Sequence, residues 1–180
     1  MAAAGGGVTR TICLHGPEST GKSSVGPRLA AALGGEIIGE YGRDYAEAHG
    51  LDFAMADLVA IAQEHDRRTR AAIARGVDPV ILDTDPLMTA AWAIMLHGRR
   101  DPWFDAWHGT ADLYLVFDID LPWVDDGTRM FGTTELRRRF LDVAVAELER
   151  RQLRWAWVRG AGEARFASAM AAIRAAGLGG

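Results

Sequence analysis

The sequence predicts an α/β fold in which a parallel five-stranded sheet is flanked by helices. Short apolar runs typical of buried strands alternate along the chain with longer segments of helical periodicity. This alternation indicates a parallel sheet with helices on both faces, and such sheets gather functional groups at the carboxyl ends of their strands. The chain has 180 residues, no internal repeat and no long linker, which is consistent with one domain.

The composition is ordinary for a soluble globular protein. It argues against a nucleic-acid partner, a disulfide-bonded fold and a membrane location. The net charge of −4 offers no basic surface, so we expect no nucleic-acid partner. Cys13 is the only cysteine, which excludes an internal disulfide and favours the cytoplasm. No apolar stretch has the length of a membrane span, and residues 1–9 lack the pattern of a secretory signal. We expect a flexible tail over residues 1–9 and a single domain over residues 10–180.

The first half of the chain predicts two strands and two helices. The apolar run at residues 11–15 predicts a strand, and a glycine-rich segment with a helical pattern follows to about residue 33. Residues 36–39 predict the second strand. Residues 54–75 predict a long helix, because one stripe carries Met55, Leu58, Ala62, His65, Thr69 and Ile73.

The second half repeats the alternation. Residues 80–82 predict a strand, and Pro86 opens a helix that ends near residue 97. Residues 113–117 are apolar on both faces, which is typical of a central parallel strand. The remaining elements are a helix capped by Thr133 or Thr134, a strand at residues 155–158 and a helix at residues 163–176.

A phosphate-binding loop is predicted between the first strand and the first helix. The pattern G-x-x-x-x-G-K-S occupies residues 16–23, directly after a strand and before a helix. Glycines let backbone N–H groups point inward at phosphate oxygens, and the helix terminus adds positive potential. We expect Lys22 to bridge the β- and γ-phosphates of ATP and Ser23 to bind Mg²⁺. The residues expected to contact the nucleotide are Gly16, Glu18, Ser19, Thr20, Gly21, Lys22, Ser23 and Ser24.

Two aspartates follow the third predicted strand. Asp83 is the first polar residue after the apolar run, so we expect it to join Ser23 at the Mg²⁺ ion. Asp85 lies two residues further on and faces the substrate in one interpretation. In the other interpretation it caps the helix that begins at Pro86.

Polar residues also follow the second predicted strand. Glu40 stands at its carboxyl end, where a carboxylate can accept the proton of an attacking hydroxyl. Arg43 is suited to hold a phosphate or to orient the acceptor. A surface salt bridge is the alternative role for Arg43.

A segment rich in glycine and charge predicts a lid. It runs over residues 118–129, after the fourth predicted strand. Small kinases use such loops to exclude water and to bring arginine to the transferred phosphoryl group. Arg129 is the first candidate, followed by Arg137 and Arg138. A solvated helix face is the alternative, and it is favoured for Arg138 and Arg139.

Taken together, these segments resemble one family. GPESTGKS, EYGRDY, DTD and PWVDDGTR occur in this order and are similar to the ribosylnicotinamide kinase domain of NadR-type NAD-salvage proteins. The resemblance covers about residues 10–160. It implies a P-loop NTPase fold of nucleoside-kinase type with a lid, and transfer of the ATP γ-phosphate to the 5′-hydroxyl of nicotinamide riboside. It also implies a stand-alone kinase domain, because no HxGH-type adenylyl-transfer motif is present.

The resemblance and the residue patterns together give a set of site residues. The acceptor is expected to be bound by Glu40, Tyr41, Arg43, Asp83, Asp85 and Asp126. The lid is expected to include Asp126 and Arg129. Relatives can carry an aromatic residue before EYGR, where this chain has Gly39. The aromatic residues considered as replacements are Tyr41, Tyr45, Trp92 and Trp103.

The mechanism expected from these charges is positioning and electrostatic stabilisation. Mg²⁺, Lys22 and Arg129 neutralise the developing charge, and Glu40, or less favourably Asp85, accepts the proton. The alternatives are a kinase for another nucleoside, or an ATPase or nucleotide-binding switch without a small acceptor. The strand that ends in Asp-Thr-Asp differs from the Asp-Glu ending that is usual in hydrolytic ATPases. The sequence gives no prediction of the oligomeric state.

Overall fold

The computed structural model describes residues 8–124 and 130–179. In this part of the chain, five strands form one parallel sheet in the order β2-β3-β1-β4-β5. The strands are β1 (Thr11–His15), β2 (Glu36–Ile38), β3 (Val80–Asp83), β4 (Leu113–Phe117) and β5 (Trp155–Val158). The predicted α/β fold with a parallel sheet is confirmed, and the strand bounds agree with prediction to within one residue. The expected tail falls mainly on residues 1–7, which lie outside the described residues.

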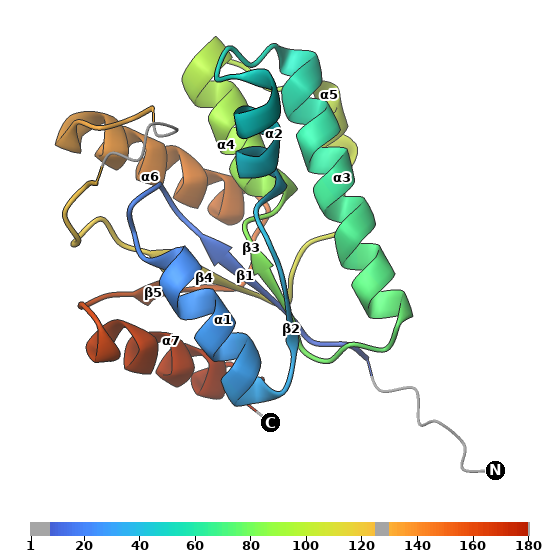
Figure 1. The fold of residues 1–180 in the computed structure, drawn as a ribbon, viewed down its shortest axis with the longest axis vertical. Helices are drawn as coiled ribbons and strands as arrows, with labels where there is room; N and C mark the ends of the chain where they lie inside the picture. The colour runs from blue at the N-terminus through green and yellow to red at the C-terminus, as the bar shows by residue number, and fades with distance from the viewer. Residues whose placement is uncertain (1–7, 125–129, 180) are drawn as a thin grey trace.

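Helices cover both faces of the sheet (Figure 1). They are α1 (Lys22–Leu33), α2 (Tyr41–His49), α3 (Met55–Ala74), α4 (Pro86–His97), α5 (Pro102–Ala106), α6 (Thr134–Arg150) and α7 (Glu163–Ala175). Helices α1 and α7 pack on one face around Ile12 and Leu14 of β1. Helices α3, α4 and α6 pack on the other face, to which Cys13 belongs. Alternate residues of β1 therefore enter two different cores. None of the helices in the described ranges combines the length and the apolar character needed to cross a bilayer.

Helices α2 and α5 are not predicted by the sequence. Helix α2 is short and mostly exposed, and its N-cap residue Glu40 makes no capping hydrogen bond through its side chain. Its local sequence therefore carries little helical signal. Helix α5 has only five residues, but Asp101 caps it and Pro102 takes its first position. This Asp-Pro pair is a helix-start signal, although the helix that follows it is too short to show a periodic pattern.

The sheet order places the end of β1 between two neighbouring strands. Leu14 is opposite Asp83 of β3, and His15 is opposite Val116 of β4. The loop after β1 therefore leaves the sheet beside the carboxyl end of β3. Gly16 begins this loop with φ of 130°, and a Cβ atom there would lie 2.8 Å from a backbone oxygen of β4. Only glycine allows the loop to pass β4 so closely.

Candidate active site

The phosphate-loop motif joins β1 to α1, as predicted. Lys22 is the first residue of α1, and its Nζ donates to the carbonyl oxygens of Gly16 at 2.8 Å and Pro17 at 2.7 Å. Lys22 is only 7% exposed, so its ammonium group lies within the curl of the loop. Phosphate oxygens are stronger acceptors than carbonyl groups, because the hydrogen bond is then assisted by charge. The loop therefore holds Lys22 ready for a phosphate chain.

Ser23 and Asp83 lie together, as predicted for a metal-binding pair. Ser23 Oγ is 3.5 Å from Asp83 Oδ2. Asp83 Oδ1 is buried and has no hydrogen-bond partner in the described part of the chain. Burial raises the pKa of Asp83, while Lys22 and Arg43 act in the opposite direction. A hydroxyl beside a carboxylate with one unused oxygen fits the oxygen ligands that Mg²⁺ prefers.

A cleft extends from this loop toward α2, α3 and α4. Its inner half is lined by all the residues expected to contact the nucleotide, namely Gly16, Glu18, Ser19, Thr20, Gly21, Lys22, Ser23 and Ser24. Its outer half is mainly apolar, with side chains from α2, α3 and α4 such as Ala46, Ile61 and Met88. Glu40, Arg43 and Thr84 line both halves. The geometry thus joins a phosphate site to a pocket for an organic group.

Glu40 is held at this boundary by the start of α2. The backbone N–H of the next residue, Tyr41, donates to His65 Nε2 of α3 at 3.2 Å. Burial lowers the pKa of His65 to about 4, so the imidazole is neutral near pH 7 and can accept this hydrogen bond. The ring of Tyr41 lies 4.5 Å from the Arg68 guanidinium. Tyr41 is absent from the cleft lining given by the described residues, so its substrate contact stays a prediction.

Asp85 occupies the core and caps α4. Its Oδ1 accepts hydrogen bonds from the N–H groups of Leu87 at 2.9 Å and Met88 at 3.4 Å. Its Oδ2 accepts one from the Tyr114 hydroxyl at 2.6 Å. Burial raises the pKa of Asp85 to about 6. The capping interpretation is confirmed. Neither half of the cleft, within the described ranges, is lined by Asp85.

The backbone turn at Thr84 places the Asp83 and Asp85 side chains on different sides of the chain. The sequence analysis did not predict this turn. Its φ is 69°, which is a rare backbone conformation for a β-branched residue. Its N–H donates to Leu14 O at 3.1 Å, which fixes the turn against β1. An ordinary extended backbone would place Asp83 and Asp85 on the same side. The turn at Thr84 instead leaves Asp83 beside the loop and Asp85 in the core.

The expected lid lies partly outside the described residues, because Asp126 and Arg129 belong to the segment that is not described. The chain on either side of that segment contacts the phosphate loop. Ser19 Oγ donates to Val124 O at 3.2 Å and accepts from Val124 N–H at 3.1 Å. Glu18 accepts from the N–H of Met130 at 3.2 Å. The loop therefore binds both flanks of the expected lid.

The arginines at the start of α6 divide into two kinds. Arg137 is buried and donates to the carbonyl oxygens of Leu121 at 3.1 Å and Ser19 at 3.3 Å. It therefore ties α6 to the phosphate loop. The Arg138 side chain is 55% exposed and lies 3.9 Å from Asp118, as expected for a solvated helix face.

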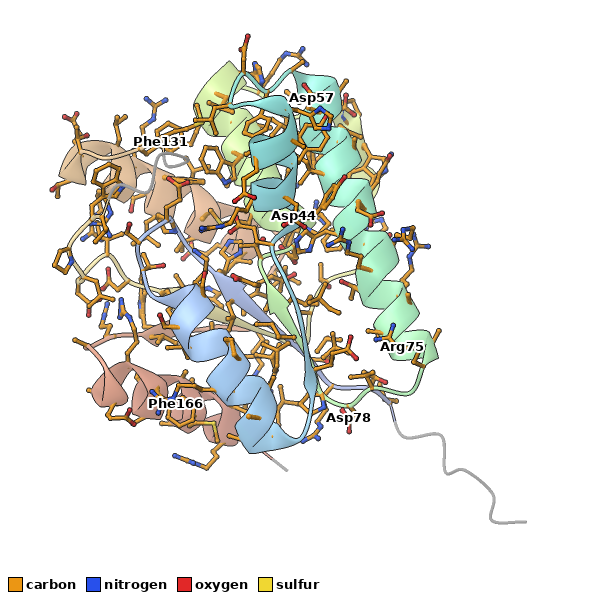
Figure 2. The ribbon with its side chains drawn as sticks, in the orientation of Figure 1. Asp44, Asp57, Arg75, Asp78, Phe131 and Phe166 are labelled. Atoms are coloured by element: carbon orange, nitrogen blue, oxygen red, sulfur yellow. The ribbon has the colours of Figure 1, made fainter. Side chains whose placement is uncertain are left out.

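Trp92 is the aromatic residue that reaches the cleft among the four considered from the sequence. It lines both halves and packs against Phe131, labelled in Figure 2, with ring centroids 5.1 Å apart. Tyr45 instead donates its hydroxyl to Asp57 at 2.6 Å. Trp103 packs on Phe104 in the core between α3 and α4. Among the four residues, Trp92 is therefore the one placed to contact a flat ring in the cleft.

The sequence is similar to a known protein family and to NAD biosynthesis proteins. A family model described as an AAA domain matches residues 11–165. The chain belongs to this family. The trifunctional NAD biosynthesis/regulator protein NadR of Escherichia coli (strain K12) is 32% identical over 146 residues, which are 78% of this chain and 36% of that protein. The AAA-family chain described here thus spans about a third of the length of the curated relatives it matches.

Solved structures show the same fold. A crystal structure of a NadR protein in complex with NR matches with a TM-score of 0.79 and 23% identity, covering 93% of this chain and 51% of that one. Deoxyadenosine kinase from M. mycoides matches with a TM-score of 0.64 and 13% identity, covering 92% and 99% of the two chains. The predicted P-loop NTPase fold of nucleoside-kinase type and the resemblance to NadR-type proteins are therefore confirmed.

Proposed function

We propose that the protein is an ATP-dependent kinase that phosphorylates the 5′-hydroxyl of nicotinamide riboside and gives nicotinamide mononucleotide. The observation that carries this proposal is that the pocket at the phosphate loop and a largely apolar pocket adjoin, with Glu40 and Arg43 in the lining of both. The acceptor is supported by the NadR relative, named for NAD biosynthesis, and by the similar NadR structure in complex with NR.

In this reaction the protein positions the reactants and balances charge. Lys22 and the loop N–H groups hold the β- and γ-phosphates of ATP. Glu40 accepts the proton of the ribose hydroxyl while that oxygen attacks the γ-phosphorus, and ADP leaves. Arg43 orients the acceptor beside the transferred group. Glu40 is preferred to Asp85 as the base because both oxygens of Asp85 already accept hydrogen bonds within the core.

Ser23 and Asp83 fit a Mg²⁺ ion, since Asp83 Oδ1 is a buried oxygen without a protein partner among the described residues. The bound ion would supply positive charge next to the β- and γ-phosphates. Arg129 is proposed to add a second positive charge from the lid.

The proposal is tested by measuring ADP release from Mg-ATP with a series of nucleosides and ribosides. We expect nicotinamide riboside to give the largest stimulation, with a stoichiometric yield of nicotinamide mononucleotide. Stimulation by a different nucleoside alone would replace the acceptor and keep the kinase class. ADP release that no acceptor changes would favour an ATPase.

The base assignment makes a separate prediction. Glu40→Gln keeps the size of the side chain but cannot accept the proton, so we expect turnover to fall by about 10²–10⁴-fold with ATP binding retained. Steady-state kinetics and ATP titration measure both effects. Asp85→Asn is the matched comparison, and we expect it to lower mainly the stability of the fold. Full turnover in Glu40→Gln, with loss in a folded Asp85→Asn, would reverse the assignment.

A further inference from the structure

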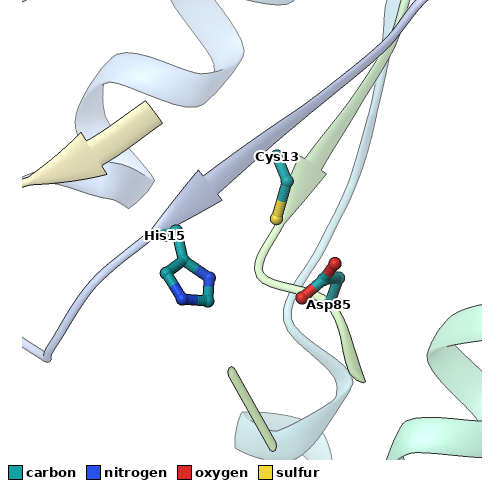
Figure 3. Close-up of side chains that lie close together, drawn as sticks. All are labelled: Cys13, His15 and Asp85. Carbon is teal, nitrogen blue, oxygen red and sulfur yellow. The ribbon is translucent and has the colours of Figure 1, made fainter. Parts of the chain in front are cut away.

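A second group of chemically reactive side chains lies below the phosphate loop, on the face of β1 that packs against α4 and α6. Cys13 and His15 are two residues apart on β1, so they point to the same side of the sheet. Asp85 reaches them from the N-cap position of α4. Figure 3 shows the three side chains converging. One donor atom from each lies within 4.8 Å of the other two, and none of the three residues is more than 1% exposed.

His15 presents an unused nitrogen to this group. Its Nε2 lies 3.2 Å from Ala144 O of α6, and only an N–H at this position can make that hydrogen bond. The neutral ring therefore carries its proton on Nε2 and a lone pair on Nδ1. His15 Nδ1 is buried without a hydrogen-bond partner among the described residues. In Figure 3 one ring nitrogen faces Cys13 and Asp85 and the other faces away.

This arrangement is typical of a histidine that binds a metal. Such histidines usually donate their second ring N–H to a carbonyl or carboxylate group, which fixes both the tautomer and the ring orientation. Asp85 is oriented in the same way, by the Tyr114 hydroxyl at 2.6 Å and by the N–H of Leu87 at 2.9 Å. Cys13 makes only a long contact to Leu14 O, at 3.8 Å. The outer contacts of a metal site are thus in place for His15 and Asp85.

We propose that Cys13, His15 and Asp85 bind a Zn²⁺ ion in the core. Thiolate sulfur, imidazole nitrogen and carboxylate oxygen are the three donor types that zinc uses in proteins. One thiolate, one carboxylate and one neutral imidazole also cancel the charge of a divalent cation, as a buried site requires.

The distances suit an ion of this size. Atoms that are at most 4.8 Å apart share a central point within about 2.8 Å of each one. Zinc binds these donors at about 2.0–2.3 Å, so an inward movement of about 0.5–0.8 Å by each side chain completes three bonds. Binding releases the thiol proton of Cys13 to solvent, and a water molecule would take the fourth position. The ion would join β1, α4 and, through His15, α6 directly beneath the phosphate loop.

The site is tested by unfolding the untagged protein in denaturant with a chelator, which removes any bound metal. After the chelator is removed, the protein is refolded with Co²⁺ or without metal. Because Cys13 is the only cysteine in the chain, a thiolate-to-cobalt charge-transfer band can come from this site alone. We expect a stoichiometric amount of bound cobalt, this near-ultraviolet band and the intense visible bands of a tetrahedral ion. Cobalt bound at Ser23 and Asp83 has only oxygen ligands and gives no such band.

Two variants of the site and one control variant distinguish metal binding from general effects on the fold. Cys13→Ala should abolish the thiolate band, and His15→Gln should lower cobalt affinity by at least about tenfold. Ile12→Val, on the same strand but facing the other core, should retain the band. Native protein that refolds without binding cobalt would overturn the proposal, as would a spectrum that Cys13→Ala leaves unchanged. Both readouts are independent of kinase activity, so they stand or fall separately from the proposed reaction.

Discussion

At the scale of single residues, the phosphate loop shows why position 22 carries a lysine and not an arginine. Lys22 is the only lysine in the chain, and the other residues in the Lys+Arg total are all arginines. A flexible stem with a compact ammonium group fits inside the phosphate loop, whereas the planar guanidinium is larger and suits fixed, forked contacts. Arg137 and Arg165 have such contacts, because each donates to two or more backbone carbonyl groups.

We therefore predict that Lys22→Ala lowers turnover by about 10²–10³-fold, because it removes a donor that the proposed mechanism places at the transferred phosphate. The fold should persist, since Pro17 O keeps the Thr20 hydroxyl as a donor at 2.8 Å. Steady-state kinetics and circular dichroism check both parts. In the unchanged protein, ATP should also protect this single lysine from an amine-modifying reagent. Turnover near normal in Lys22→Ala would contradict the proposed mechanism.

The aspartates show what the sequence can and cannot predict at this scale. Asp83 was predictable because it is the first polar residue after an apolar strand that pairs with β1. The inward course of Asp85 depends on φ of 69° at Thr84, which no propensity favours. Tertiary packing imposes that conformation, so sequence reasoning could name both roles for Asp85 without choosing between them.

At the scale of elements, Arg165 joins three loops around the nucleotide site. It stands on α7 and is 2% exposed. Its guanidinium donates to Thr20 O of the phosphate loop at 2.9 Å and to Gly160 O after β5 at 2.9 Å. It also donates to Asp118 O after β4 at 2.7 Å and to Asp120 Oδ1 at 2.6 Å. The loops that follow β1, β4 and β5 are thus tied to one side chain.

We predict that Arg165→Met destabilises the protein by about 1–3 kcal/mol, because several buried carbonyl groups lose their donor. The KM for ATP should rise, because Thr20 belongs to the phosphate loop. Urea denaturation and kinetics measure the two effects. Arg28→Met is the control, since the exposed ion pair of Arg28 with Glu163 contributes little. Equal stability of the two variants would show that Arg165 does not organise these loops.

Sequence reasoning missed Arg165 for a physical reason. A charged residue in a helical pattern is normally exposed, and its burial depends on carbonyl groups contributed by loops far away in the chain. Helix α2 was not predicted because it too depends on contacts with a distant part of the chain. Its first turn is supported by His65 of α3, whose position depends on how the two helices pack. The regular strands, by contrast, show their apolar patterns locally and were predicted to within one residue.

At the scale of the whole molecule, the site depends on contacts between layers. The sheet supplies the loop and Asp83, while Glu40 and Arg43 belong to the α2 segment above it. That segment makes backbone contact with α3 through His65, which is 1% exposed. The groups that act electrostatically on His65 are Arg68, Glu64 and Asp44. The protonation state of one buried imidazole thereby connects the α2 side of the cleft to the stability of the fold.

We predict that the free energy of unfolding decreases as the pH falls from about 6.5 to about 4. Burial lowers the pKa of His65 from 6.5 to about 4, so the unfolded chain binds a proton in this range that the folded chain does not. One such proton corresponds to a slope of about 1.4 kcal/mol per pH unit. Denaturant titrations at several pH values measure the slope. His65→Gln keeps an acceptor for Tyr41 N–H but does not titrate, so it should lower the slope by about this amount. The contribution of His15, whose pKa burial also lowers to about 4, should remain. His108→Gln, at an exposed position, is the control and should leave the slope unchanged. Equal slopes in the two variants would show that His65 does not cause the pH dependence.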